Sequence, residues 1–378
     1  MAKMRIYVVD LESVPTRYTC EWKSHLPAML REEIAKSGAD IEVINISGGE
    51  ESIEATPGAF LNFQATNIYK NNQLSDIARR FTSEVKAGDK FLFADAWHTG
   101  ILQLKYMSEL LNIPVEIHGL WHAGSYDPHD FLGRITGDTS WIRHTEQALF
   151  NAIDHNYFAT QFHIKLFSDS YAPTAEEYGS MSQDDEVDYF ITDNTNSGKI
   201  IQTGWPMEYM PTLFHKYDST VKEDIIIFPH RVAPEKQPEI FRDLAASMPQ
   251  YKFVVCQDSK LSKEEYHKLL AKSKIMWSAN KQETLGISPM EGALLGVVPM
   301  LPDRLSYSEM YTGDYLYPSE WTNSYSAYLR HKSTIMEMIT TVIENYDTME
   351  NDVRTVLAPH LMKNYFTATN LVNKIIGK

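Results

Sequence analysis

The chain has 378 residues, of which 43% are hydrophobic, and a formal net charge of −15. A chain of this length exceeds what one hydrophobic core usually supports, so two domains are expected, with a ligand site in the cleft between them. The negative charge opposes nonspecific attraction to nucleic-acid phosphates, which argues against a nucleic-acid partner without excluding one that meets a local basic surface.

The cysteines and the N-terminal segment bear on the cellular compartment. Cys20 and Cys256 are too few and too distant for a disulfide framework or a Cys-type zinc site, which fits a reducing environment. The opening residues run almost directly into a strand-like sequence, and no apolar stretch is long enough to cross a bilayer. These features predict a cytoplasmic protein without membrane insertion and leave its oligomeric state open.

In the first half of the chain, runs rich in β-branched and aromatic residues alternate with helix-like stretches. The expected strands are 4–10, 40–46, 90–95, 114–119 and 156–161. The expected helices between them include 24–38, 71–88 and 100–112. This alternation is typical of βαβ units around a parallel sheet.

The same pattern restarts after a polar stretch that follows residue 206. Further strands are expected at 225–230, 251–258, 274–280 and 297–301. One helix among them has a defined start, because Ser262 and Glu265 have the spacing of a capping box. The last segment is helical on both sides of Pro359 and apolar enough to dock.

The chain is therefore expected to be an α/β protein of two successive doubly wound units. Residues 1–205 form the first Rossmann-like domain and residues 206–354 the second. Residues 355–378 are expected to form a C-terminal helix that packs back on the first domain.

Two glutamates follow the expected strand 274–280, Glu283 in a loop over 281–287 and Glu291 in a helix over 288–295. Ligands of parallel α/β sheets bind at the carboxyl ends of strands, where helix N-termini present free N–H groups. The spacing alone is weak evidence, because two glutamates eight residues apart arise readily by chance in a chain of this size.

Glu291 also has an explanation that needs no ligand. With Ser288 as N-cap and Pro289 at the first helical position, Glu291 completes a capping box. Glu283 has no such local explanation, although a solvated loop carboxylate is an alternative. Gly286 lies between the two glutamates and lacks a Cβ, so it would let a ligand approach the backbone closely.

A second loop, "FPHRVAPEKQPEIF", carries two cations at another strand end. Arg231 and Lys236 lie five residues apart, between the strand 225–230 and a helix that begins near Pro238. A guanidinium and an ammonium in such a loop can converge on a diphosphate. Solvation of both side chains by water is the alternative, and the matching second loop favours the functional interpretation.

These two loops resemble the donor-site signature of retaining GT-B glycosyltransferases of the glycogen-synthase and family 4 type. Over residues 225–318, "PHRVAPEKQPEIF" and "PDRLSYSEMYTGDYLYP" are similar to segments of tRNA-queuosine mannosyltransferase-like proteins. In the N-terminal half only the strand order, "EIHGLWH" and "YFATQF" correspond loosely. The resemblance implies two Rossmann-like domains facing a central cleft, with a nucleotide-sugar donor bound by the second domain and an acceptor mainly by the first.

The resemblance assigns roles at the nucleotide end of the donor, expected to be a UDP- or GDP-linked sugar. Arg231 and Lys236 would hold the diphosphate, and Glu291 the ribose hydroxyls. Charge builds on the departing diphosphate as the glycosidic bond breaks, so preorganised cations there lower the barrier. No D-x-D triplet occurs in the sequence, so transfer is expected to need no metal or other cofactor, with the two cations in the metal's place.

At the sugar end, the resemblance implies contacts from Glu283 and from the backbone of Leu285, Gly286 and Ile287. His118 follows the strand-like "PVEI", where the family often places a histidine near the donor sugar, and is the remaining catalytic candidate. A histidine satisfied by hydrogen bonds in a loop is an equal alternative.

Acceptor contacts are expected in the first half of the chain, at Asp95, His122 and Arg17. Asp95 ends an expected strand, and His122 lies four residues after His118. The first loop of the family is usually glycine-rich, whereas "DLESVPTRYTCEW" contains no glycine. Arg17 in this loop would either supply charge to the donor or reach the acceptor.

The implied activity is transfer of a sugar from a nucleoside diphosphate to an acceptor hydroxyl, with retention of configuration. Likeness to a tRNA-base mannosyltransferase and to phage DNA-base glycosyltransferases makes a hydroxymethylated DNA base or a tRNA base the first acceptor candidate. Glycan or lipid acceptors remain open. A nucleotide-sugar 2-epimerase and a noncatalytic nucleotide-sugar-binding module are the alternatives of a different class.

Overall fold

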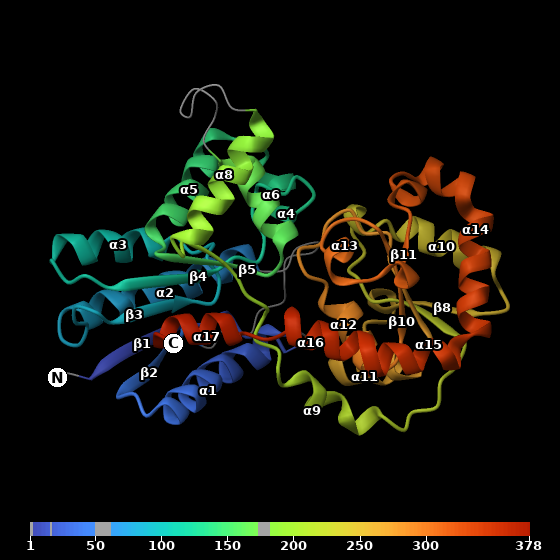
Figure 1. Ribbon diagram of the computed structural model, residues 1–378, viewed down its shortest axis with the longest axis horizontal. Helices are drawn as coiled ribbons and strands as arrows, with labels where there is room; N and C mark the ends of the chain where they lie inside the picture. The colour runs from blue at the N-terminus through green and yellow to red at the C-terminus, as the bar shows by residue number, and fades with distance from the viewer. Residues whose placement is uncertain (1–2, 16, 50–61, 173–181) are drawn as a thin grey trace. The chain divides into compact units, whose positions relative to one another are not determined.

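The protein divides into two compact units, shown in Figure 1. The computed structural model describes residues 3–15, 17–49, 62–172 and 182–378. The first unit comprises Met1–Pro206 and Ala368–Lys378, and the second comprises Met207–Thr367. The sequence predicts that the chain returns to the first unit from residue 355, whereas the return begins at Ala368.

A parallel sheet of six strands, counted over the described residues, organises the first unit in the order β2-β1-β3-β4-β5-β6. These strands are β1 (Met4–Val9), β2 (Ile41–Ile46), β3 (Lys90–Phe93), β4 (Glu116–Leu120), β5 (His155–Phe158) and β6 (Ile200–Gln202). In β1, Val8 pairs with Asn45 of β2 on one side and with Leu92 of β3 on the other. The strands expected in this half of the chain are present, with their ends shifted by a few residues.

Helices cover this sheet, and the last of them comes from the C-terminal segment. They are α1 (Thr19–Ser37), α2 (Phe63–Phe81), α3 (Gly100–Leu110), α4 (Phe131–Thr136), α5 (Ser140–Ala152), α6 (Gln161–Tyr171), α8 (Gln183–Asn196) and α17 (Thr369–Ile376). Helix α17 lies alongside α1 and also contacts β6 (Figure 1). It buries Leu371, Val372 and Ile375, which is why it stays with the first unit.

The second unit repeats the architecture with a parallel sheet in the order β11-β10-β9-β7-β8. Its strands are β7 (Ile225–Phe228), β8 (Lys252–Val255), β9 (Ile275–Trp277), β10 (Val298–Pro302) and β11 (Leu316–Tyr317). In each sheet the chain lays its second strand on one side of the first and its third strand on the other. The topological switch points are therefore β1/β3 and β7/β9, where open α/β sheets bind ligands at the carboxyl ends.

The helices of the second unit surround its sheet (Figure 1). They are α9 (Met210–Phe214), α10 (Pro238–Ser247), α11 (Lys263–Lys272), α12 (Ile287–Leu294), α13 (Tyr307–Met310), α14 (Tyr325–Glu344), α15 (Tyr346–Asp352) and α16 (Ala358–Asn364). Single-turn 3-10 helices lie at His215–Tyr217, Pro234–Lys236, Cys256–Ser259, Gly313–Tyr315 and Ser319–Thr322. A short π-helix at Val353–Leu357 joins α15 to α16. None of the helices in the described ranges is long and apolar enough to cross a membrane.

Of the two capping boxes considered in the sequence, one is confirmed and one is wrong. Ser262 and Glu265 make both reciprocal hydrogen bonds at the start of α11. Helix α12 begins at Ile287 rather than Ser288, and its N-cap is Gly286, which has no side chain with which to cap the helix. Gly286 has φ of 89°, a left-handed conformation open to glycine, and it turns the chain into the helix before Ser288 can act as a cap.

A buried carboxylate fixes the loops that follow β3 and β4. Glu146 on α5 accepts hydrogen bonds from Trp97 Nε1 at 2.6 Å, from the Ser125 backbone N–H at 2.7 Å and from Ser125 Oγ at 2.7 Å. The hydroxyl of Tyr171 on α6 also donates to it. Glu146 thus joins the two loops to α5 and α6. Each donor would lose its partner if the carboxylate were removed.

Replacing this carboxylate tests its contribution. We expect Glu146→Gln to lower the free energy of unfolding by about 2–3 kcal/mol, because an amide presents donors toward groups that themselves donate. Urea denaturation would measure the change. The control is Glu109→Gln, whose carboxylate is largely exposed on α3 and should change stability by less than about 0.5 kcal/mol. Equal effects of the two substitutions would contradict the assigned role.

Candidate functional site

Two loops meet at the switch point of the second sheet, one after β7 and one after β9. The Lys281 backbone N–H donates to the carbonyl of Glu235 at 2.7 Å. Lys236 Nζ donates to the carbonyl of Gln282 at 2.5 Å. These bonds join the two segments that the sequence singled out, so residues some fifty positions apart form one surface at the carboxyl edge.

The two cations of the first loop are each held by a carboxylate. Arg231 donates through Nε at 2.9 Å and Nη2 at 2.6 Å to Oε1 of Glu235, whose carboxylate is almost fully buried. Lys236 Nζ lies 3.4 Å from Glu283 Oε2. The structure therefore brings Lys236 and Glu283 together, while Glu235 orients the guanidinium of Arg231.

Gly286 lies against the same group of residues. A Cβ at this position would lie 3.0 Å from Tyr307 Cε1 and 3.6 Å from Glu283 Cγ, so a larger residue would press on the tyrosine ring. Leu285 before it is buried in the core, and Ile287 after it is half-buried. Residues 285–287 therefore bring backbone groups, together with the partly exposed Ile287 side chain, to the start of α12.

Glu291 lies farther along α12. Its Oε2 accepts a hydrogen bond from Tyr266 OH on α11 at 2.9 Å. Burial and the Glu291 carboxylate hold the pKa of Tyr266 well above its usual value, so the phenol stays protonated and donates. The neighbouring helix α11 thus orients the carboxylate of Glu291.

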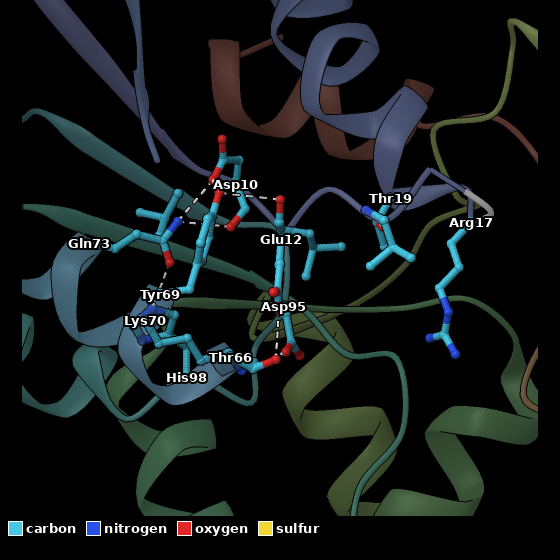
Figure 2. Close-up of a pocket in the computed structure, with 13 residues that line it drawn as sticks. Asp10, Glu12, Arg17, Thr19, Thr66, Tyr69, Lys70, Gln73, Asp95 and His98 are labelled. Atoms are coloured by element: carbon cyan, nitrogen blue, oxygen red, sulfur yellow. Dashed lines mark hydrogen bonds and ion pairs between the residues drawn. The ribbon is translucent and has the colours of Figure 1, made fainter. Parts of the chain in front are cut away.

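The first unit has a polar pocket at its own switch point (Figure 2). Loop residues after β1 and β3 and side chains of α2 line a volume of about 30 Å³, including Asp10, Glu12, Arg17, Thr66, Lys70 and Asp95. Two of the predicted acceptor residues, Arg17 and Asp95, therefore line one pocket. The guanidinium of Arg17 lies apart from the cluster around Asp10 (Figure 2).

Asp95 is held in its charged form by an ammonium from α2. Lys70 Nζ lies 2.9 Å from Asp95 Oδ2 and donates to the carbonyl of Trp97 at 2.5 Å. The Trp97 backbone N–H donates to Asp95 Oδ1 at 3.0 Å. Burial raises the pKa of Asp95, but the charge of Lys70 and these hydrogen bonds outweigh it, so the pKa lies below its ordinary value.

Asp10 directly follows β1, and its pKa is shifted in the opposite direction, above its ordinary value. Its Oδ1 accepts hydrogen bonds from Tyr69 OH at 2.5 Å and Gln73 Nε2 at 3.0 Å. Burial raises the pKa of Asp10 to about 6, although hydrogen bonds from Tyr69, Ser47 and Gln73 and the charge of Lys23, 3.9 Å away, oppose it. The sequence signal for Asp10 was its place after "YVV" at the end of the first strand.

Glu12 and Lys70 were also missed from the sequence. Glu12 Oε2 accepts a hydrogen bond from Thr66 Oγ1 at 2.6 Å. Both Lys70 and Thr66 belong to α2, and nothing in their local sequence marks them. Only the docking of α2 beside the ends of β1 and β3 makes them part of the pocket.

The two histidines of "EIHGLWH" occupy different environments. His118 lies inside β4 rather than after it and is fully buried. Its Nε2 lies 2.8 Å from Glu116 Oε1 and its Nδ1 2.8 Å from Tyr157 OH, and burial lowers its pKa to about 4. The His118 side chain is fully buried inside β4, so its ring is not accessible to a ligand in this structure.

His122 is the histidine that follows β4. Its Nε2 lies 2.7 Å from the Ala94 carbonyl, so this nitrogen carries the proton, and its Nδ1 lies 3.0 Å from Tyr18 OH. Burial lowers the pKa of His122. His122 thus links the loop after β3 to α1 as a neutral imidazole.

Metal ligation is not indicated in the part of the chain that the structure describes. No group of three or more histidine, cysteine, aspartate and glutamate side chains there is placed to hold a metal ion. The polar groups at the two switch points include carboxylates, ammonium and guanidinium groups, hydroxyls and an amide, which suit hydrogen-bonding ligands.

Solved structures that resemble this chain over almost its whole length include glycosyltransferases with the GT-B fold. Sucrose-phosphate synthase from Thermosynechococcus elongatus is 9% identical at a TM-score of 0.59, with 99% of this chain and 97% of that chain covered. The chain has the GT-B fold. The pneumococcal O-GlcNAc transferase GtfA, in complex with UDP and GlcNAc, is 11% identical at a TM-score of 0.57 over the full length of both chains. Anabaena HepE, in complex with UDP and glucose, is 10% identical at a TM-score of 0.53, with 99% and 98% covered.

Sequence comparison adds one curated relative. The tRNA-queuosine alpha-mannosyltransferase of Drosophila melanogaster is 23% identical over 199 residues, 44% of this chain and 52% of the relative. The chain thus matches about half the length of that relative. No family model matches the chain.

The raised pKa of Asp10 predicts a specific pH dependence of stability. A carboxyl whose pKa is about 6 in the folded protein, against an ordinary value of 3.8, stabilises the folded state below pH 4, and this contribution is lost as the pH rises through 6. Relative to Asp10→Asn, the wild type should therefore lose roughly 2–3 kcal/mol of unfolding free energy between pH 4 and pH 7. Urea denaturation of the wild type and of Asp10→Asn at both pH values measures this change in unfolding free energy.

The matched control for this measurement is Asp40→Asn, which removes an exposed carboxylate on the surface. Its difference from the wild type should stay nearly constant between the two pH values. A constant difference for Asp10→Asn as well would show that Asp10 titrates normally in the folded protein.

Proposed function

We propose that this protein is a glycosyltransferase that moves a sugar from a nucleoside-diphosphate sugar to an acceptor hydroxyl. The observation that carries the proposal is the joining of the loops after β7 and β9, with Lys236 Nζ 3.4 Å from Glu283 at the switch point of a GT-B fold. A cation for the diphosphate and a carboxylate for the sugar thus lie side by side. The GT-B neighbours crystallised with UDP and a sugar support a UDP-linked donor, with GDP as the alternative.

The proposed mechanism follows from charge. As the bond between the anomeric carbon and the phosphate oxygen breaks, its electron pair passes to the diphosphate, whose charge Arg231, Lys236 and the N-terminal N–H groups of α12 stabilise. Pairing with Glu235 fixes the plane of the Arg231 guanidinium, which has five N–H donors to share. We propose that no metal takes part.

Glu283 and Glu291 have different proposed contacts on the donor. Glu283, with the backbone from Leu285 to Ile287, contacts the transferred sugar, and Glu291 binds the ribose hydroxyls. We propose retention of configuration, in which the leaving phosphate accepts the proton of the acceptor hydroxyl on the same face of the sugar. That route requires no carboxylate nucleophile.

For the acceptor, we propose a modified nucleobase, in DNA or in tRNA. The relative named a tRNA-queuosine alpha-mannosyltransferase supports this choice over a glycan or lipid. Asp95, His122 and Arg17 in the first unit are the proposed acceptor contacts. The buried carboxylates of Asp10 and Glu12, which line the same pocket as Asp95 and Arg17, accept hydrogen bonds, so they suit an acceptor that presents hydroxyl or amino groups.

A screen of nucleotide sugars tests both the donor and the acceptor. UDP- and GDP-sugars are incubated with tRNA, hydroxymethylcytosine DNA or simple glycans, and release of the nucleoside diphosphate is measured. We expect release that depends on one of the nucleic acids. Release with a glycan alone would overturn the nucleobase acceptor, and interconversion of the sugar without any acceptor would indicate a 2-epimerase.

Substitutions in the first loop test the donor site. We expect Arg231→Ala and Lys236→Ala each to lower turnover of the nucleotide sugar at least about 100-fold, because each removes a cation from the leaving group. The control is Arg242→Ala on α10, an exposed arginine paired with Asp258, which should leave turnover unchanged. Near-normal turnover of both loop variants, with folding verified by circular dichroism, would refute the assignment of the diphosphate site.

A further inference from the structure

His230 immediately precedes Arg231 and is left unused by the mechanism above. Its side chain is buried at the carboxyl end of β7, with the residue 7% exposed. Its Nε2 has no hydrogen-bond partner among the described residues. A buried imidazole nitrogen without a partner costs free energy in this state of the protein, and a bound ligand that supplies a partner would offset that cost.

The surroundings of His230 indicate what would satisfy it. Burial first, and then the charges of Lys236 and Arg231, hold the pKa of His230 well below its ordinary value. The imidazole is therefore neutral and carries a proton on one nitrogen, which it can donate. His230 belongs to the same loop as Arg231 and Lys236 and has an unpartnered nitrogen, so its neutral ring is suited to an anionic oxygen, which both the cations and an N–H would attract.

We propose that His230 is a third ligand of the donor diphosphate, donating a hydrogen bond from its imidazole to a phosphate oxygen alongside Arg231 and Lys236. The inference rests on the proposed function, and it names the residue that completes the diphosphate contacts. The imidazole keeps its proton throughout, because the bond that breaks is the one between sugar and phosphate. His230 thus adds a hydrogen-bond donor without adding a third buried positive charge.

A second histidine of the same unit provides a matched control. His267 on α11 is also buried, its Nε2 likewise lacks a partner among the described residues, and it packs edge-on against Phe214. His267 is not part of the loops after β7 and β9, and its ring packs against Phe214 of α9 and Tyr266 of α11. Replacing either histidine removes a buried imidazole, whereas only the replacement of His230 removes a phosphate contact.

The experiment compares His230→Phe, His230→Gln and His267→Phe by calorimetric titration with UDP, GDP and the corresponding nucleosides. We expect His230→Phe to weaken binding of the nucleoside diphosphate about 10-fold or more and to leave nucleoside binding unchanged. His230→Gln, whose amide can donate, should recover part of the loss. His267→Phe should bind both ligands as the wild type does, and unfolding by urea verifies that each variant is folded.

The contrary outcomes are distinct. If His230→Phe and His230→Gln bind the diphosphate within twofold of the wild type, or lose diphosphate and nucleoside affinity equally, His230 is not a phosphate ligand and the proposal is overturned. If the wild type binds neither diphosphate, the proposed function itself fails. If His230→Phe does not fold, His230→Leu takes its place in the titration, and diphosphate affinity within twofold of the wild type for that variant would also overturn the proposal.

Discussion

The buried ammonium of Lys236 constrains the carboxyl edge of the second sheet. A lysine that is only 5% exposed must have its charge satisfied by protein groups, because leaving it unpaired would cost several kcal/mol. Its partners, the Gln282 carbonyl and the Glu283 carboxylate, both belong to the loop after β9. Satisfying one side chain of the first loop therefore determines the path of the second, and with it the position at which α12 begins.

The two sheets share one strand order but present different chemistry at their switch points. The second unit offers Arg231 and Lys236, which suit a phosphate. The first unit offers the carboxylates of Asp10, Glu12 and Asp95, with Lys70 neutralising the last. A common topology can thus present different ligand chemistry, since the strand order fixes where a ligand can bind, whereas the loop residues decide which ligand.

Much of this arrangement could be predicted from sequence, because the strands are short, apolar and separated by clear helical stretches. The two loops of the second unit were found for the same reason: their cations and glutamates directly follow predicted strands. The pocket of the first unit was found only in part. Lys70 and Thr66 reach it from the N-terminal half of α2, and helical periodicity says nothing of which loop a helix face will meet.

The errors in the sequence interpretation have physical causes as well. His118 was placed at a strand end because "PVEI" looked complete, yet the Glu116 carboxylate and Tyr157 hydroxyl satisfy the imidazole well enough to keep it inside β4. The capping box at Ser288 was plausible by spacing alone. The left-handed backbone of Gly286 made it unnecessary, and that conformation cannot be seen in a pattern of residue types.

The return of α17 to the first unit has a consequence for how the protein is made. The second unit is one continuous stretch, Met207–Thr367, and all of it has been synthesised before the ribosome reaches α17. The first unit, although translated earlier, lacks the helix that covers part of α1 and β6 until α17 has emerged. The half of the protein that begins first is therefore completed after the other, and a fragment ending near residue 206 would expose the apolar surface that Leu371, Val372 and Ile375 otherwise cover.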